Sequence, residues 1–151
     1  MDLSGRIDIK APKAQVAAAI RDPEVLRQMI PACSGVERVS DSAFDARIEK
    51  EIGPITLRLN VRITVDPPED ADVYQMQVTG RSMIAGSVQM TADLALAARG
   101  DRTTLDYSGT LAATGLCAKV LHGRETMLAD RTTAMFHKLR QEIEAQARTG
   151  V

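Results

Sequence analysis

The chain has 151 residues, of which 19 are Lys or Arg and 20 are Asp or Glu, so its formal net charge is −1. A chain of this size buries roughly 70% of its unfolded surface on folding, and we expect one globular domain over residues 1–151. The balanced charge argues against nucleic acid as a partner. No apolar run reaches the ~18 residues that cross a bilayer, and the residues MDLSGRIDIK lack the charged region and apolar region of a signal peptide, so a cytoplasmic protein is expected.

The N-terminal third predicts a strand followed by two short helices. Residues 2–10 alternate between apolar and polar side chains, which indicates a half-buried strand. The residues at 13–20 are rich in Ala and follow a proline that suits the first turn of a helix. An Asp-Pro pair opens a second helix over 22–29, which should stop there because the next residue precedes Pro31.

After a loop over 31–35 the hydrophobic period becomes two and keeps this value to about residue 113. Turn sequences at 53–54, 66–72 and 99–102 divide this region into strands. The acidic segment 66–72 is interpreted as a solvated loop. Alternation with short turns indicates an antiparallel sheet that has one face in water. With the first strand, the sheet should contain seven strands.

From about residue 117 to residue 148 the period changes to 3.6, which predicts one long amphipathic helix. Its apolar stripe contains Cys117, Leu121, Leu128, Met135 and Leu139. The sheet and the helix each have one apolar side, and each is the natural cover of the other. The fold class is therefore α+β, with a curved antiparallel sheet wrapped around a long C-terminal helix.

The interior is predicted to be poor in large side chains. The chain has only four aromatic residues, Phe44, Tyr74, Tyr107 and Phe136, and no Trp. Aromatic rings normally supply the largest single blocks of buried area. Met76 and Met90 in the strands and Met135 in the helix either fill gaps in a dry core or line a space that accepts varied apolar shapes.

Several segments resemble the CoxG-like family of carbon monoxide dehydrogenase subunits. The resemblance is strongest in Asp22-Pro23-Glu24-Val25-Leu26 and Met29-Ile30-Pro31-Ala32-Cys33. It continues in Val39-Ser40-Asp41, Phe44-Asp45-Ala46, Ile52-Gly53-Pro54-Ile55 and the glycine-spaced stretch from Gly80 to Asp93. The family usually has Gly at the position of Ala32. It often has an aromatic residue at the position of Ala17.

This family is part of the helix-grip superfamily that includes START-like and Bet v 1-like proteins (SRPBCC). The resemblance implies a non-enzymatic domain that binds a lipid or quinone-like molecule between sheet and helix and requires no cofactor. It also implies service to a carbon monoxide dehydrogenase-type molybdenum hydroxylase. Many members carry a C-terminal tail that attaches them to the membrane, whereas this sequence ends at Val151. We therefore expect membrane contact to be at most peripheral, at the inner face of the cell membrane.

Two other functional classes stay open. Some relatives in the superfamily are cyclases or dehydratases of aromatic ketides, and such an enzyme needs an inward hydroxyl such as that of Tyr74 or Tyr107. A small interaction protein with a filled interior is the third possibility. Ligand class, oligomeric state and enzyme partner are not fixed by the residues.

The usual catalytic and metal-binding patterns are missing from the sequence. His122 and His137 lie 15 positions apart on one predicted helix, both on its outer side, so they cannot share a metal. Cys33 and Cys117 have no neighbouring base in the sequence and are predicted to be free thiols. The stretch from Gly80 to Gly86 is not followed by a helix, as a phosphate-binding loop requires.

The candidate ligand-binding residues are those that the predicted registers place on the inner faces of the sheet and helix or at the mouth between them. They are Ile30, Cys33, Met76, Val78, Met90, Leu94, Tyr107, Leu121, Arg124, Leu128 and Met135. Arg124 interrupts the apolar stripe of the helix. It either lies in water at the open end of the space or meets the polar head group of an otherwise apolar ligand.

Overall fold

The computed structural model describes residues 1–30, 32–82 and 86–148, and for residues 52, 55, 120 and 121 it describes the backbone alone. The elements follow the order β1 (Asp2–Ile9), α1 (Lys13–Ala19), α2 (Pro23–Met29), β2 (Cys33–Ser40), β3 (Ala43–Ile52), β4 (Ile55–Asp66), β5 (Val73–Ser82), β6 (Gly86–Arg99), β7 (Arg102–Ala113), α3 (Gly115–Leu121) and α4 (Glu125–Arg148).

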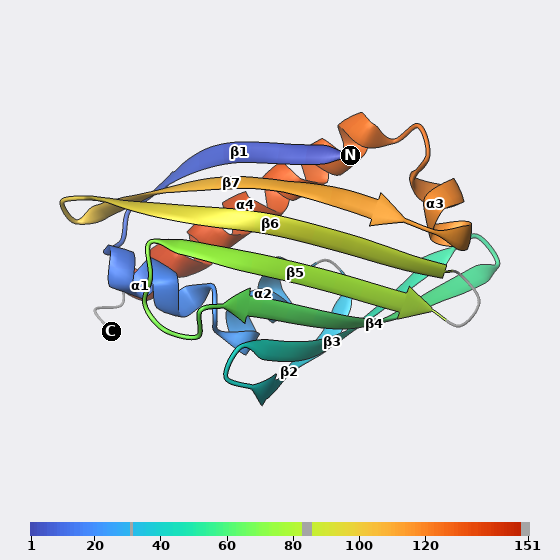
Figure 1. Cartoon of the computed structure of the whole chain (residues 1–151), viewed down its shortest axis with the longest axis horizontal. Coiled ribbons are helices and arrows are strands. Elements are labelled where there is room, and N and C mark those ends of the chain that lie inside the picture. The colour runs from blue at the N-terminus through green and yellow to red at the C-terminus, as the bar shows by residue number, and fades with distance from the viewer. Residues whose placement is uncertain (31, 83–85, 149–151) are drawn as a thin grey trace.

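The seven strands form one antiparallel sheet with the order β1-β7-β6-β5-β4-β3-β2. Helix α4 runs along one face of this sheet, from the region of α3 at one end to α1 at the other (Figure 1). It packs against β1, α2 and α1. The predicted fold, a curved antiparallel sheet closed by a long C-terminal helix with two short helices after the first strand, is confirmed.

The alternating pattern places the expected side chains inside. In β1, Leu3, Ile7 and Ile9 are buried while the residues between them are exposed or half-buried. The turn at residues 53–54 joins β3 to β4, and the acidic segment lies between β4 and β5 as predicted. The inner face of the sheet therefore carries the apolar rows that the period of two indicated.

The two short helices end where their sequences indicate. The Asp22 carboxylate accepts a hydrogen bond from the Glu24 N–H at 2.9 Å and caps α2. Ile30, which precedes a proline, is extended and ends the helix. Ala32 then adopts a left-handed backbone with φ of 59°. Glycine accepts this conformation without strain, which gives a physical reason for the family's preference for Gly at this position.

Two boundaries differ from the prediction. The single long helix expected from Cys117 onward is two helices, because Gly123 adopts a left-handed φ of 72° between α3 and α4. Cys117 and Leu121 thus belong to α3 and not to α4. The expected loop over 31–35 is shorter than predicted, since β2 already begins at Cys33 and pairs there with Ile48.

Candidate functional site

In β3 to β7, burial of the inner-face side chains falls from the end near α1 to the end near α3. In β5, Tyr74 is 0% and Met76 is 5% exposed, whereas Val78 is half-buried. The same order holds in the neighbouring strands and in α4. The half-buried apolar residues at the α3 end include Ile48, Leu57, Leu59, Val78, Val88, Met90, Leu111, Leu128 and Met135. We call this part of the interior the open end, and the opposite part the closed end.

The four aromatic rings fill the closed end and its border. Phe44 and Tyr74 are fully buried. Tyr107 stacks on Phe136 from α4, with ring centroids 3.9 Å apart and planes within 7°. Beyond this stack, toward α3, the next inward positions of β7 are Gly109 and Leu111. The four aromatic rings therefore all lie in one half of the interior, and the other half is lined by aliphatic side chains and methionines.

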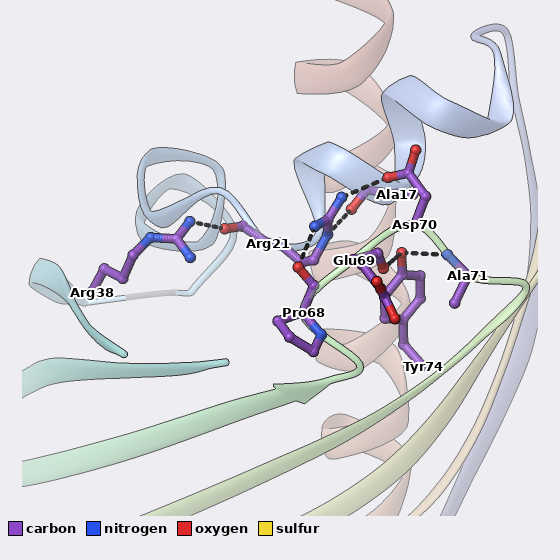
Figure 2. A network of polar contacts seen from close by, with 8 residues as sticks. All are labelled: Ala17, Arg21, Arg38, Pro68, Glu69, Asp70, Ala71 and Tyr74. Carbon is purple, nitrogen blue, oxygen red and sulfur yellow. Dashed lines mark hydrogen bonds and ion pairs between the residues drawn. The ribbon is translucent and has the colours of Figure 1, made fainter. Parts of the chain in front are cut away.

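A polar network fastens the closed end (Figure 2). Arg21 follows α1 and donates hydrogen bonds to the Ala17 carbonyl at 3.0 Å, the Pro68 carbonyl at 2.8 Å and the Asp70 carboxylate at 2.7 Å. Arg38 donates to the Arg21 carbonyl at 2.8 Å. Lys13 and Asp72 form an ion pair. The acidic loop over 66–72 exposes its carboxylates, as predicted for a solvated loop. Its backbone is nevertheless held against α1, because Arg21 bonds the carbonyls of both Pro68 and Ala17.

The Tyr74 hydroxyl is part of the same closure. It donates to the Glu69 carbonyl at 2.7 Å and accepts from the Ala71 N–H at 2.9 Å. Both of its strong hydrogen-bonding positions thus serve the loop that closes this end. The Tyr107 hydroxyl, in contrast, has no hydrogen-bond partner among the residues that the structure describes.

The predicted ligand-binding residues fall into three groups. Leu94, Met76 and Tyr107 are buried in the packed part of the interior. Arg124 is exposed in the break between α3 and α4, and the Leu121 side chain lies outside the described part of the structure. The half-buried members of the set are Ile30, Cys33, Val78, Met90, Leu128 and Met135. Of these, Val78, Met90, Leu128 and Met135 belong to the open end, and Cys33 is opposite Ile48 in the sheet register.

The two cysteines and two histidines occupy different environments. Cys117 is buried, and burial raises the pKa of its thiol above the ordinary value. Cys33 is half-buried. His122 is exposed as predicted. His137 is half-buried rather than solvent-facing, with an Nδ1 that is buried and has no partner within the described residues. Among these residues, no cluster of His, Cys, Asp or Glu could hold a metal ion.

Two depressions accompany this arrangement. A small pocket of about 150 Å³ lies at the open end, where the end of β7 meets α3 and the start of α4. It is lined by Met1, Leu111, Ala112, Ala113, Ala118, His122, Glu125 and Leu128. A groove of about 1060 Å³ lies on the opposite, outer face of the sheet, over β2 to β5. The sequence pattern does not indicate this groove, because alternation identifies the outer face only as the side of the sheet in water.

Comparison with known proteins places this fold in a family. A family model for the CoxG subunit of carbon monoxide dehydrogenase matches residues 5–148, nearly the whole chain. The chain belongs to the CoxG family. A search of curated proteins gave no match for this CoxG-family chain. None of the helices in the described residues is long and apolar enough to span a membrane.

Solved structures share the fold of this CoxG-family chain at low sequence identity. A conserved protein from Geobacillus kaustophilus superposes with a TM-score of 0.75 at 22% identity, covering 95% of both chains. A START superfamily protein from Mycobacterium smegmatis gives 0.64 at 14% identity over 99% of both chains. The Zhui aromatase/cyclase from a Streptomyces species gives 0.66 at 14% identity over 99% of this chain and 97% of that chain. The chain thus has the START-like, helix-grip fold.

Proposed function

We propose that this CoxG-family chain binds a hydrophobic small molecule, a lipid or quinone-like compound, at the open end between the sheet and α4. One observation carries the proposal. Apolar side chains on the inner faces of five strands and of α4 become accessible together at one end, while the other end is packed and fastened by Arg21 and Tyr74. Apolar surface left half-exposed in a concave region is stabilised by an apolar occupant, by about 25 cal/mol for each Å² covered.

The composition of the open end suits an occupant of variable shape. Met90 and Met135 face the same region from the sheet and from α4, and both are half-buried. Methionine has three rotatable bonds and a polarisable sulfur, so it adapts to different apolar ligands. The closed end, with its stacked Tyr107 and Phe136, is too well packed to serve this purpose.

Binding requires the open end to widen. Its pocket holds about 150 Å³, whereas small-molecule sites usually measure about 300–1,000 Å³. The chain has a place where it can move: α3 lies between Gly115 and Gly123, both in left-handed conformations. The Gly115 end is held, since Thr114 N–H donates to the Ser87 carbonyl at 2.8 Å. Rotation at Gly123 would therefore shift α4 relative to α3 and enlarge the space beneath them.

Membership of the CoxG family supports the proposal that the chain serves as an accessory to a carbon monoxide dehydrogenase-type molybdenum hydroxylase. In this role the chain is a non-enzymatic accessory, acting in the cytoplasm with at most peripheral membrane contact. The proposal takes the bound molecule as the link between the enzyme and the membrane. Arg124, exposed at the mouth, is available to a polar head group of the ligand.

A direct test compares two lysine substitutions in neighbouring positions of β6. Met90→Lys places an unpaired ammonium group on the inner face at the open end, and Thr91→Lys places one on the exposed outer face. We expect Met90→Lys to weaken binding of the fluorescent probe 1-N-phenylnaphthylamine at least about tenfold, and Thr91→Lys to leave it unchanged. Native mass spectrometry of the wild-type chain should show a lipophilic passenger. Equal binding by both variants, or a wild-type chain that takes neither passenger nor probe, contradicts the proposal.

The accessory role has a separate test. The immobilised chain should retain a molybdenum-containing dehydrogenase from an extract of its source organism, detected as molybdenum in the eluate. A column without protein is the control. An eluate with no more molybdenum than this control contradicts the accessory role and leaves ligand binding standing.

An enzymatic role on an apolar or aromatic substrate is the second candidate, and the Tyr107 hydroxyl favours it. Tyr107 lies at the border between the packed end and the open end, and its hydroxyl has no hydrogen-bond partner in the described part of the chain, so a substrate that fills the open end is the group this hydroxyl would meet. The test is to incubate purified protein with the compounds it retains and follow their conversion. Turnover that is lost in Tyr107→Phe with unchanged affinity supports an enzyme, whereas stable recovery of the bound compound contradicts it.

A further inference from the structure

Three arginines on the outer face of the sheet pair with carboxylates of neighbouring strands. Arg6 in β1 is directly opposite Asp106 in β7 and bonds it at 2.6 Å. In β4, Arg58 is opposite Glu49, and its Nε lies 3.7 Å from the Glu49 Oε2. Arg62, also in β4, is opposite Asp45 and forms an ion pair with it. Each of these cations thus has its carboxylate at the facing position of the neighbouring strand, the arrangement that favours cross-strand pairs.

Two rows depart from this pattern. At the hairpin between β6 and β7, Arg99 is opposite Arg102, and its Nε donates to the Thr104 hydroxyl at 3.0 Å. The other row crosses β3, β4 and β5. Arg47 in β3 and Arg81 in β5 are both opposite the same residue of β4, Asn60. All three side chains are exposed on the outer face. Neither arginine has an ion pair or a side-chain hydrogen bond within the residues that the structure describes. Two guanidinium groups thus flank a neutral amide, and the carboxylates in the rows on either side of Arg47, those of Asp45 and Glu49, are each engaged by another arginine.

This row lies in the large groove of about 1060 Å³ on the outer face. Adjacent strands are about 4.8 Å apart, so the backbones of Arg47 and Arg81 are separated by roughly 10 Å with Asn60 midway. Both arginine side chains are long enough to reach a group above Asn60, whose amide N–H₂ is a further donor. The negative residues of the groove are in the next row, where Asp45 is opposite Glu37 and is already engaged by Arg62.

We propose that Arg47, Asn60 and Arg81 form a binding site for a phosphate-type oxyanion on the outer face of the sheet. Guanidinium groups bind phosphate in a bidentate manner, and two of them around one site supply both charge and geometry. The site is separate from the interior ligand space and does not depend on it. The oxyanion comes either from free phosphate compounds or from the headgroups of anionic lipids, which share this chemistry.

The experiment follows the arginine Nε–Hε resonances of the ¹⁵N-labelled chain during titration with inorganic phosphate at constant ionic strength. We expect saturable shifts at Arg47 and Arg81. Arg47→Gln and Arg81→Gln should each weaken phosphate binding about tenfold, equivalent to about 1.4 kcal/mol. Arg58→Gln is the matched control, since it removes the same charge from the same face at a residue that already has a carboxylate partner. It should bind as the wild type does.

A second measurement distinguishes the two sources of the anion. The same four proteins are floated with vesicles of phosphatidylcholine alone or with added phosphatidylglycerol. Saturable binding of inorganic phosphate supports the site with a free anion as its ligand. Flotation that requires phosphatidylglycerol and is lost in Arg47→Gln and Arg81→Gln supports it with a lipid headgroup. Loss of binding to the same extent in Arg58→Gln, or no saturable response in either assay, overturns the proposal.

Discussion

At the scale of single residues, the two tyrosines illustrate how the same side chain on the same kind of inward row acquires different roles. Tyr74 and Tyr107 are both buried in the sheet, and the sequence gives no reason to treat them differently. The hydroxyl of Tyr74 is engaged by the loop between β4 and β5, at Glu69 and Ala71. That of Tyr107 has no partner in the described residues.

This difference predicts unequal costs for removing the two hydroxyl groups. Tyr74→Phe leaves the Ala71 N–H and the Glu69 carbonyl without their partner and should lower the free energy of unfolding by about 1–2 kcal/mol. Tyr107→Phe should change it by less than about 0.5 kcal/mol. Urea unfolding followed by circular dichroism measures both variants. Equal losses in the two would show that the hydrogen bonds of Tyr74 contribute nothing specific.

At the scale of secondary-structure elements, β1, β7 and α4 are coupled through one ring. Gly5 in β1 is opposite Tyr107 in β7, and a Cβ at Gly5 would lie 2.4 Å from the Tyr107 hydroxyl oxygen. The ring of Tyr107 occupies the space above this glycine and stacks on Phe136 of α4. A missing side chain in the edge strand therefore allows an aromatic contact between sheet and helix.

Gly5→Ala should consequently disturb more than β1. The ring of Tyr107 has to move, and we expect a loss of about 1–3 kcal/mol in the free energy of unfolding. In a Tyr107→Leu background the additional loss should be clearly smaller, because the ring is gone, and a double-mutant cycle measures this coupling. Gly35→Ala is the control, since a Cβ there meets nothing within 4 Å. Additive effects of Gly5→Ala and Tyr107→Leu would contradict the proposed coupling.

At the scale of the whole molecule, the two ends of the interior differ in how firmly they are held. The end near α1 combines fully buried side chains with the bonds of Arg21, Lys13 and Tyr74. The end near α3 has half-buried apolar side chains and a helix break at Gly123. Regions with few buried contacts open at lower free energy than the packed core, so motion that admits a ligand belongs at the α3 end.

The two cysteines both lie at the end near α3 but differ in burial: Cys33 is half-buried opposite Ile48, and Cys117 is buried in α3. Alkylation requires the thiolate, and the raised pKa of Cys117 lowers its thiolate fraction at any pH below its ordinary pKa of 9.0. At pH 8 we expect iodoacetamide to modify Cys33 first. Modification of Cys117 should require a higher pH than an ordinary exposed thiol does, because burial raises its pKa.

Occupation of the open end should slow the modification of Cys33 and leave the rate at Cys117 unchanged. Peptide mass spectrometry measures the two modification rates with and without the naphthylamine probe. The variants Cys33→Ser and Cys117→Ser identify which modified peptide belongs to which cysteine. Faster modification of Cys117 than of Cys33 at pH 8 would contradict the burial described here. A rate of Cys33 modification that does not change with the probe would show that the probe binds away from the open end.

Local features of the molecule could be predicted from the sequence because they depend on near neighbours in the chain. The alternation in β1 to β7, the Asp22 cap of α2 and its end before Pro31 are each determined within a few residues. The break at Gly123 cannot be predicted in this way, since the apolar period on both sides outweighs one glycine in a helical pattern. The family resemblance supplied the ligand-binding hypothesis, while periodicity supplied only the side chains that face inward.

The amino-acid sequence alone determined which side chains face inward, how many strands there are and that a helix must cover them. Only the tertiary structure decided that the aromatic rings gather at one end, that Arg21 reaches across to close that end, and that Arg47 and Arg81 share Asn60 as their neighbour. Inward or outward orientation follows from a period that each strand carries within itself. The position along the sheet and the facing residue depend on register between strands far apart in the chain, and no single segment contains that information.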